Sequence, residues 1–153
     1  PEALQQTYRV RQAIEPAALL EPGYALANGI LQRLIATEMA MLEGQIEILS
    51  PDELYQVGVD FHEALIAGSR NPFFIETLHR VNQARRLIAY RTMFDRGRYY
   101  QQAEEHLAIL RCIQGNDQAG AAEAMRRHLA SVVSSLGKIE PELRSSDSSE
   151  TVT

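Results

Sequence analysis

The chain has one cysteine, one lysine and no tryptophan among its 153 residues. The single cysteine, Cys112, excludes an internal disulfide and every zinc motif built from several cysteines, and it is typical of a reducing compartment. No apolar run approaches the roughly 18–20 residues that a membrane span needs, and no signal peptide opens the chain. We therefore expect a cytoplasmic protein with no membrane partner.

The chain is acidic overall, with a formal net charge of −5. Phosphate binding depends on clustered Lys and Arg, so this charge argues against a nucleic-acid surface on this segment. The length suits one ordinary domain with a real core. The apolar fraction of 45% is ample for both that core and a subunit interface.

Strand signals are missing, because apolar and polar residues do not alternate over any long stretch and β-branched residues are sparse. The breaks are spaced for helices, and we predict an all-α fold, an antiparallel helical bundle of about six helices. The folded domain is expected over residues 1–140, and residues 141–153 are expected to form a mobile polar tail because they offer almost nothing to bury. The predicted helices cover about residues 5–20, 23–43, 51–69, 72–96, 98–114 and 117–138.

Three histidines, His62, His106 and His128, each lie on the apolar side of a different predicted helix. His106 comes nine residues before Gly115, and His128 comes eleven residues after Asp117. A helix hairpin with its turn at this point brings the two side chains level. His62 precedes the break at Asn71 by nine residues, so it lies at a comparable distance along its own helix from the nearest break.

A lone histidine on an apolar face is more often a core residue than a ligand, but three at one level favour a metal or an anionic ligand. Imidazole nitrogens suit Zn, Ni or Mn, and three protein ligands leave an open coordination position. The fourth histidine, His79, has polar neighbours and is expected at the surface. Di-iron carboxylate enzymes use two Glu-x-x-His motifs. This chain has one, from Glu76 to His79, so we do not expect such an enzyme.

Two arginines lie on apolar stripes of the predicted fourth helix, and a guanidinium there can clamp a carboxylate or form a structural ion pair. Aromatic residues at helical spacing suit a cavity wall as well as a core. We expect five residues to line a pocket for an anionic effector, namely Arg85, Arg91, Tyr55, Tyr99 and Gln102.

Several motifs resemble one bacterial family. The letters FHEALI of residues 61–66, followed by GSRNP of residues 68–72, resemble the "FH…(A/S)(S/G)xNP" signature of FCD domains, the effector-binding C-terminal domains of GntR-type transcription regulators. The segment from Glu105 to His128 resembles the family's "EHxxIxxAIxxGDxxxAxxxMxxH" block. Arg11 with Glu15-Pro16 resembles its "RxxxEP" opening. Together these matches cover about residues 8–136.

The resemblance implies a helical bundle that binds a small organic acid or related metabolite, often beside a divalent metal held by one aspartate and three histidines. His62, His106 and His128 match the three histidine positions, whereas Gly58 stands at the aspartate position. Water or the effector's own carboxylate could replace that ligand. The resemblance also implies a homodimer and a winged helix-turn-helix DNA-binding domain that is absent from this chain.

The sequence thus predicts the ligand-sensing and dimerisation domain of a GntR-type regulator, and not an enzyme. A metal-dependent helical-bundle enzyme acting on a small acid is the alternative, and turnover of a candidate acid would favour it. A purely structural dimerisation module is a third possibility, which an empty, collapsed cavity would favour.

Overall fold

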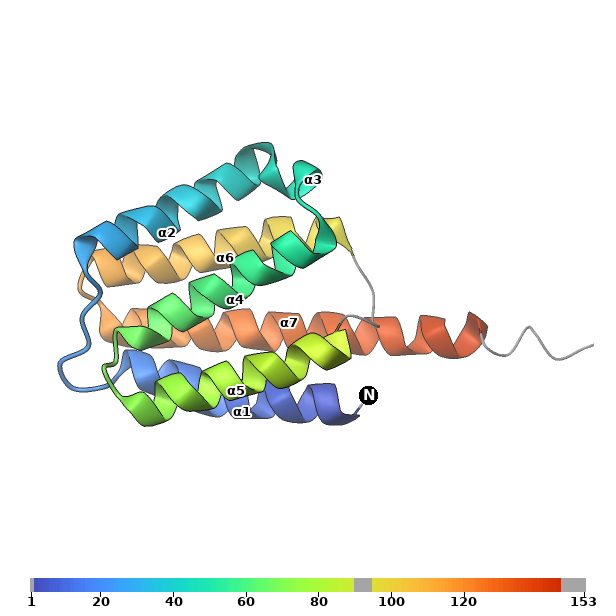
Figure 1. Ribbon diagram of the computed structural model, residues 1–153, viewed down its shortest axis with the longest axis horizontal. Helices are drawn as coiled ribbons and strands as arrows, with labels where there is room; N and C mark the ends of the chain where they lie inside the picture. Colours follow the sequence, from blue (N-terminus) through green and yellow to red (C-terminus); the bar gives the residue numbers. More distant parts are fainter. Residues whose placement is uncertain (1, 90–94, 147–153) are drawn as a thin grey trace, which may run out of the picture.

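A computed structural model describes residues 2–89 and 95–146, with side chains described for residues 2–88 and 95–136. All regular elements in this part of the chain are helices, which confirms the predicted all-α bundle. The long helices alternate in direction, with α6 packed on α7, and α1 packed on both α7 and α5 (Figure 1). The elements are α1 (Glu2–Leu19), α2 (Asn28–Ala40), the π-helical turn η1 (Met41–Gln45), α3 (Ile46–Ile48), α4 (Pro51–Ala67), α5 (Pro72–Ala89), α6 (Arg96–Gln114) and α7 (Gln118–Ser146).

The helix that carries His62 starts where its sequence predicts. Ser50 is the N-cap of α4, and its hydroxyl oxygen accepts a hydrogen bond from the Glu53 backbone N–H at 3.2 Å. The Glu53 carboxylate accepts one in return from the Ser50 backbone N–H at 2.8 Å. This reciprocal capping box, with Pro51 at the first helical position, fixes the start of α4 and hence the height of His62 along the bundle.

The segment before α2 differs from the prediction, because α2 begins at Asn28 and not near Gly23. Gly23 has a φ of +77° and turns the chain out of a helical path. The Tyr24 hydroxyl donates a hydrogen bond to the Leu65 carbonyl oxygen at 2.7 Å, and the Ala25 N–H donates to the Gly68 carbonyl oxygen at 3.1 Å. These contacts with the end of α4 hold the connection in a non-helical form.

Three other differences concern helix ends. The fourth helix was predicted to end near Arg96, but Asp95 is the N-cap of α6 and Arg96 is its first residue. The predicted second helix is interrupted by η1, where Gly44 adopts a φ of +140° that an α-helix does not allow. The predicted end of the last helix near Lys138 was wrong, because α7 continues through Pro141 to Ser146. Loss of one N–H to proline weakens a helix but does not always end it. Residues 147–153 of the predicted tail lie outside the described part of the chain, and the domain boundary at residue 140 stays a prediction.

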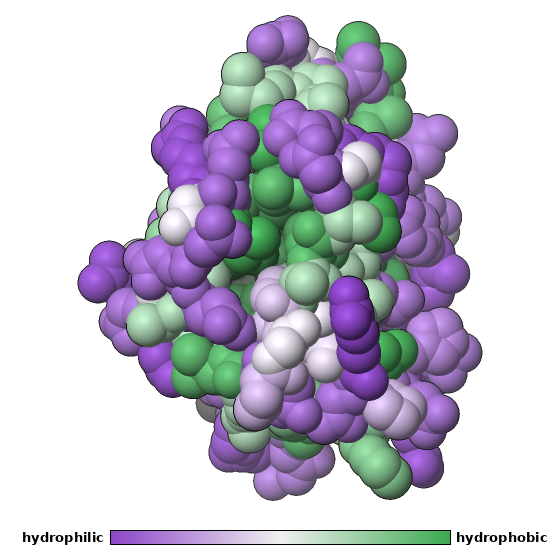
Figure 2. All heavy atoms as spheres, turned by 90° about the vertical axis from the view of Figure 1, so that its left-hand side faces the viewer, coloured by the Kyte–Doolittle hydropathy of each residue, from purple (hydrophilic) through white to green (hydrophobic). Residues whose placement is uncertain are grey.

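The main core joins α1, α2, α4, α6 and α7. Its largest fully buried members are Leu19, Phe61, Leu65, Ile109, Leu110, Met125 and Leu129. Apolar atoms also line a hollow at the end of the bundle that holds the α1–α2 connection, a cavity of about 320 Å³ (Figure 2). In the described residues, no helix combines the length and apolar character that crossing a membrane requires.

Candidate metal and ligand site

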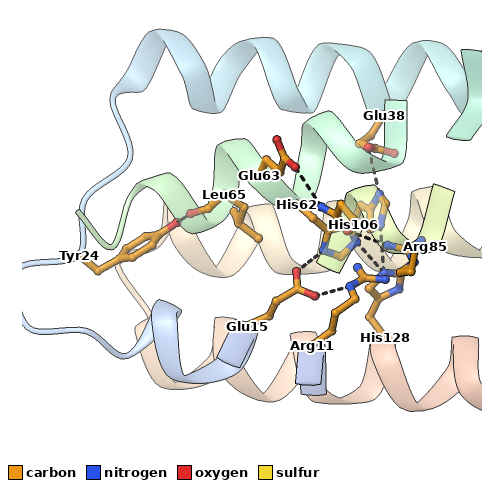
Figure 3. Close-up of polar contacts among 11 residues, drawn as sticks. Arg11, Glu15, Tyr24, Glu38, His62, Glu63, Leu65, Arg85, His106 and His128 are labelled. Atoms are coloured by element: carbon orange, nitrogen blue, oxygen red, sulfur yellow. Dashed lines mark hydrogen bonds and ion pairs between the residues drawn. The ribbon is translucent and has the colours of Figure 1, made fainter. Parts of the chain in front are cut away.

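The three histidines predicted to lie level do meet inside the bundle (Figure 3). His62 comes from α4, His106 from α6 and His128 from α7, and all three are buried. The Nε2 atom of His128 lies 3.1 Å from Nε2 of His106 and 3.2 Å from Nε2 of His62. One ligand atom from each residue lies within 4.8 Å of the others, so a single ion can reach all three.

The opposite nitrogen of each ring faces a carboxylate. An Nδ1–H that donates to a carboxylate fixes the tautomer and leaves the Nε2 lone pair free, which is the usual arrangement behind a metal-bound histidine. In the tautomer with the proton on each Nδ1, the three Nε2 atoms present lone pairs toward one point. The pairs are His62 with Glu15 at 2.6 Å, His106 with Glu38 at 3.0 Å, and His128 with Glu105 at 3.1 Å.

Glu15 links the histidine cluster to α1. One carboxylate oxygen lies 2.6 Å from His62 Nδ1, and the other accepts a hydrogen bond from Arg11 Nε at 2.7 Å (Figure 3). Glu15 and Arg11 are both buried. Burial alone would raise the pKa of Glu15, but Arg11 and His62 lower it to about 2. The carboxylate is therefore ionised and acts as a fixed acceptor for the His62 ring.

Burial keeps two of the imidazoles neutral. It lowers the pKa of His62 to about 3, despite the opposing effect of Glu15. Burial and the neighbouring imidazoles hold the pKa of His106 well below its ordinary value. Burial also raises the pKa of Glu38, the partner of His106, to about 8. Since neutral imidazole is the form that coordinates a metal, the site has His62 and His106 in that form over the physiological pH range.

Gly58 lies one turn before His62 on the same side of α4 and lines the same cavity. A Cβ atom placed on Gly58 would have nothing within 4 Å. The position where the resemblance places an aspartate is thus open space, and no other residue has filled it. The cavity has a volume of about 580 Å³ and extends from the histidines past Gly58 to a group of arginines.

Four of the five predicted effector residues line this cavity: Tyr55, Arg85, Tyr99 and Gln102. The fifth, Arg91, lies outside the described residues. His79, predicted at the surface, is exposed. The cavity thus brings together side chains from the third, fourth and fifth predicted helices, and it adds Tyr8 and Arg11 from α1.

Arg85 is a half-buried cation that lines the pocket. Its guanidinium lies over the rings of Tyr8 and Tyr55, with 5.1 Å and 5.4 Å to their centroids, and Nη1 donates to the Asn82 side-chain oxygen at 2.9 Å. Its Nε has no hydrogen-bond partner within the described residues, and the same is true of Nε of Arg98. Burial and the nearby Arg11 lower the pKa of Arg85. The pocket therefore has cationic donors to offer to an anion.

Sequence reasoning missed two features of the site. One is the set of glutamates in hydrogen-bond contact with the histidine rings, and the other is the Tyr8 ring that lies against Arg85. Glu38 had a usable signal, because it shares one helical stripe with the buried Leu31, Leu34 and Met41. An acid in an apolar stripe needs a buried partner. Glu15 and Arg11 were noted only as part of a family motif, and the contact of Glu15 with His62 spans 47 residues of sequence.

The fold and the site define an all-α bundle whose buried histidine cluster opens on an arginine-lined cavity. Comparison with known families matches residues 6–131 to the FCD domain. The chain therefore belongs to the FCD domain family, the effector-binding C-terminal domain typical of GntR-family regulators. No curated protein sequence gives a match. The family is one of regulatory proteins.

Proposed function

We propose that this domain senses a small organic acid for a GntR-type transcriptional regulator, and that a divalent metal forms one end of its ligand site. The observation that carries the proposal is the convergence of three Nε2 atoms, each ring backed by a carboxylate, at the end of an arginine-lined cavity. A set of three imidazoles suits Zn, Ni or Mn. When bound, the ion supplies a positive charge and open coordination positions for a carboxylate oxygen.

The protein's own residues have separate tasks in this proposal. His62, His106 and His128 hold the ion, and their glutamate partners orient the rings. Arg85, supported by the Tyr8 and Tyr55 rings, binds the acid. Because these side chains come from α1, α4, α5, α6 and α7, an acid in the cavity contacts most of the bundle at once. Binding can thereby favour one arrangement of the helices over another, which is the requirement for coupling to a distant DNA-binding domain.

Homodimerisation is a second part of the proposal. In a dimer, a change inside each bundle would alter the relative placement of two DNA-binding domains supplied by the rest of the regulator. The interface is expected to use outward helical surfaces, since exposed apolar side chains such as Phe73 and Leu87 of α5 lie outside the core.

Native mass spectrometry of the purified protein tests these points together, because it reports dimer mass, bound metal and any co-purified acid. A dimer that carries metal and an acid is the expected result. Incubation with candidate acids and analysis of the products then separates sensor from enzyme. Saturable binding without product supports the sensor, whereas turnover would favour the alternative of a metal-dependent enzyme.

A further inference from the structure

A short chain of hydrogen bonds connects Arg85 to a carboxylate on the neighbouring helix. Asn82 of α5 is only 3% exposed, and its side-chain oxygen accepts a hydrogen bond from Arg85 Nη1 at 2.9 Å. The Nδ2 group of Asn82 donates to the Glu63 carboxylate of α4 at 3.2 Å. Glu63 and Arg85 are thus joined through one amide and not directly (Figure 3). Arg85 lines the cavity, whereas Asn82 and Glu63 lie behind its wall.

The two neighbours of the Asn82 amide fix the direction in which it points. A carboxylate only accepts hydrogen bonds, and a guanidinium only donates them. A reversed amide would turn its oxygen toward Glu63 and its NH₂ group toward Arg85, and both contacts would be repulsive. The backbone carbonyl of Asn82 also accepts a hydrogen bond from the Tyr55 hydroxyl at 3.2 Å, and the Tyr55 ring lies beside the Arg85 guanidinium. One residue therefore supports Arg85 both directly and through Tyr55.

Two arginines of the cavity wall differ in how their charge is compensated. Arg11 Nε donates to the Glu15 carboxylate at 2.7 Å, so a negative charge already balances this guanidinium. Arg85 donates to a neutral amide, and it forms no ion pair in the part of the chain that the structure describes. A carboxylate at position 82 would form a stronger hydrogen bond with Arg85, but it would also cancel the charge. An amide holds the guanidinium and leaves its charge available to an anion.

We propose that Asn82 is a positioning residue, which holds Arg85 at the cavity wall while leaving its positive charge for the ligand, and that Glu63 fixes the orientation of Asn82. The inference rests on the proposed function, because it takes Arg85 as the group that binds the acid. It deepens that function, since it assigns the affinity of this wall for anions to a buried residue that does not touch the ligand.

The decisive variant exchanges the two groups behind Arg85. Glu63→Gln combined with Asn82→Asp keeps the net charge and the side-chain shapes. It also allows both hydrogen bonds, because the new amide can donate to the new carboxylate, which accepts from Arg85. The carboxylate then forms an ion pair with the guanidinium that an anion would have to displace. We expect the affinity for anions to fall by about tenfold or more, the usual range for the loss of a hydrogen bond to a charged group.

Two single variants are the matched controls. Glu63→Gln alone removes the negative charge but leaves a neutral amide on Arg85, so it should not weaken anion binding. Asn82→Leu removes both side-chain hydrogen bonds at a similar volume and keeps the backbone carbonyl that Tyr55 contacts. Its Arg85 guanidinium should lose its fixed position. Far-UV circular dichroism checks that each variant is folded.

NMR spectroscopy of the Arg85 Nε–H group measures both effects in the metal-free protein. Its resonance is identified as the one that is missing in Arg85→Lys. Its ¹⁵N relaxation reports the order of the guanidinium, which should be high in the wild type and in the exchange variant and low in Asn82→Leu. Its shift on titration with succinate, and separately with inorganic phosphate, reports anion affinity at constant ionic strength. If Asn82 only stabilised the fold, the folded exchange variant would bind anions like the wild type.

The outcomes separate this inference from the proposed function. If the folded exchange variant binds anions as tightly as the wild type, or if Arg85 is as ordered in Asn82→Leu as in the wild type, the role of Asn82 is refuted while the proposed function stands. If the wild-type resonance responds to neither succinate nor phosphate, the binding of an acid by Arg85 fails, and this inference fails with it. Should Asn82→Leu not fold, the exchange variant still decides, because it retains every hydrogen bond.

Discussion

Replacing Glu15 with glutamine should destabilise the metal-free protein strongly, because it removes the charge that compensates Arg11. Both residues are buried, and Arg11 Nε donates to the Glu15 carboxylate at 2.7 Å. Glutamine keeps an oxygen for His62 Nδ1–H but turns an N–H group toward Arg11, so one buried donor faces another. A buried charge left without its partner typically costs about 3–5 kcal/mol.

The lowered pKa of Glu15 gives a second estimate of this loss of stability. The value is about 2 in the folded chain against an ordinary 4.5. At about 1.36 kcal/mol per pH unit, this difference corresponds to about 3 kcal/mol of stability. Because the folded-state pKa is the lower one, the contribution is complete above pH 4.5 and is lost as the pH falls toward 2.

Urea unfolding in the presence of a chelator measures the effect. A loss of about 3 kcal/mol with a slope of about 2 kcal/mol per molar urea moves the midpoint down by about 1.5 M. Glu76→Gln, an exposed glutamate on α5, is the control and should change stability by less than about 0.5 kcal/mol. The double variant Arg11→Met with Glu15→Gln should lose less than the two single losses added together.

Two results would refute this reasoning. One is a loss of less than about 1 kcal/mol in Glu15→Gln, well below the cost of an unpaired buried charge. The other is an acid dependence of stability between pH 4.5 and 2 that is the same in the variant and the wild type.

Three further predictions concern the whole domain. Between about pH 5 and 6.5 the metal-free protein should gain on the order of 1 kcal/mol of stability, since the pKa values of His62 and His106 are lowered on folding and the raised pKa of Glu38 offsets one of them; urea unfolding that shows no gain would contradict it. Gly68→Ala should cost about 1–3 kcal/mol, because its Cβ would lie 2.8 Å from the Tyr24 ring, and an unchanged thermal midpoint would refute that close packing. Sedimentation at micromolar concentration should show a dimer, and a monomer throughout would contradict it.

Much of the fold could be predicted because it depends on local signals. The capping box at Ser50 and the break at Asn71-Pro72 fix α4, and apolar periodicity fixes which sides of α6 and α7 face inward. The α1–α2 connection could not be predicted, since its form depends on a hydrogen bond from Tyr24 to Leu65, 41 residues away. Local propensity contains no information about such a contact.

The candidate site also has parts that could be predicted from the sequence and parts that could not. The histidines could be found because each lies on an apolar stripe and the helix hairpin sets their height. The apolar stripe of Glu38 indicated that it faces inward, but neither Glu15 nor Glu38 could be assigned its histidine, because these contacts span 47 and 68 residues of sequence. The open space beside Gly58 could not be predicted from the sequence either. A larger side chain from a neighbouring helix could have filled it, and none does.

Metal content per chain tests the central claim most directly. The wild type, His106→Ala and the exposed-histidine control His79→Ala are equilibrated with excess Ni²⁺ and succinate, freed of unbound ion by dialysis against succinate, and analysed by emission spectrometry. We predict about one ion per chain in the wild type and in His79→Ala, and loss of that ion in His106→Ala, because one of only three protein ligands is gone. A wild type without nickel, or a His106→Ala variant that retains as much as the wild type, would contradict the assignment of the three histidines as a metal site.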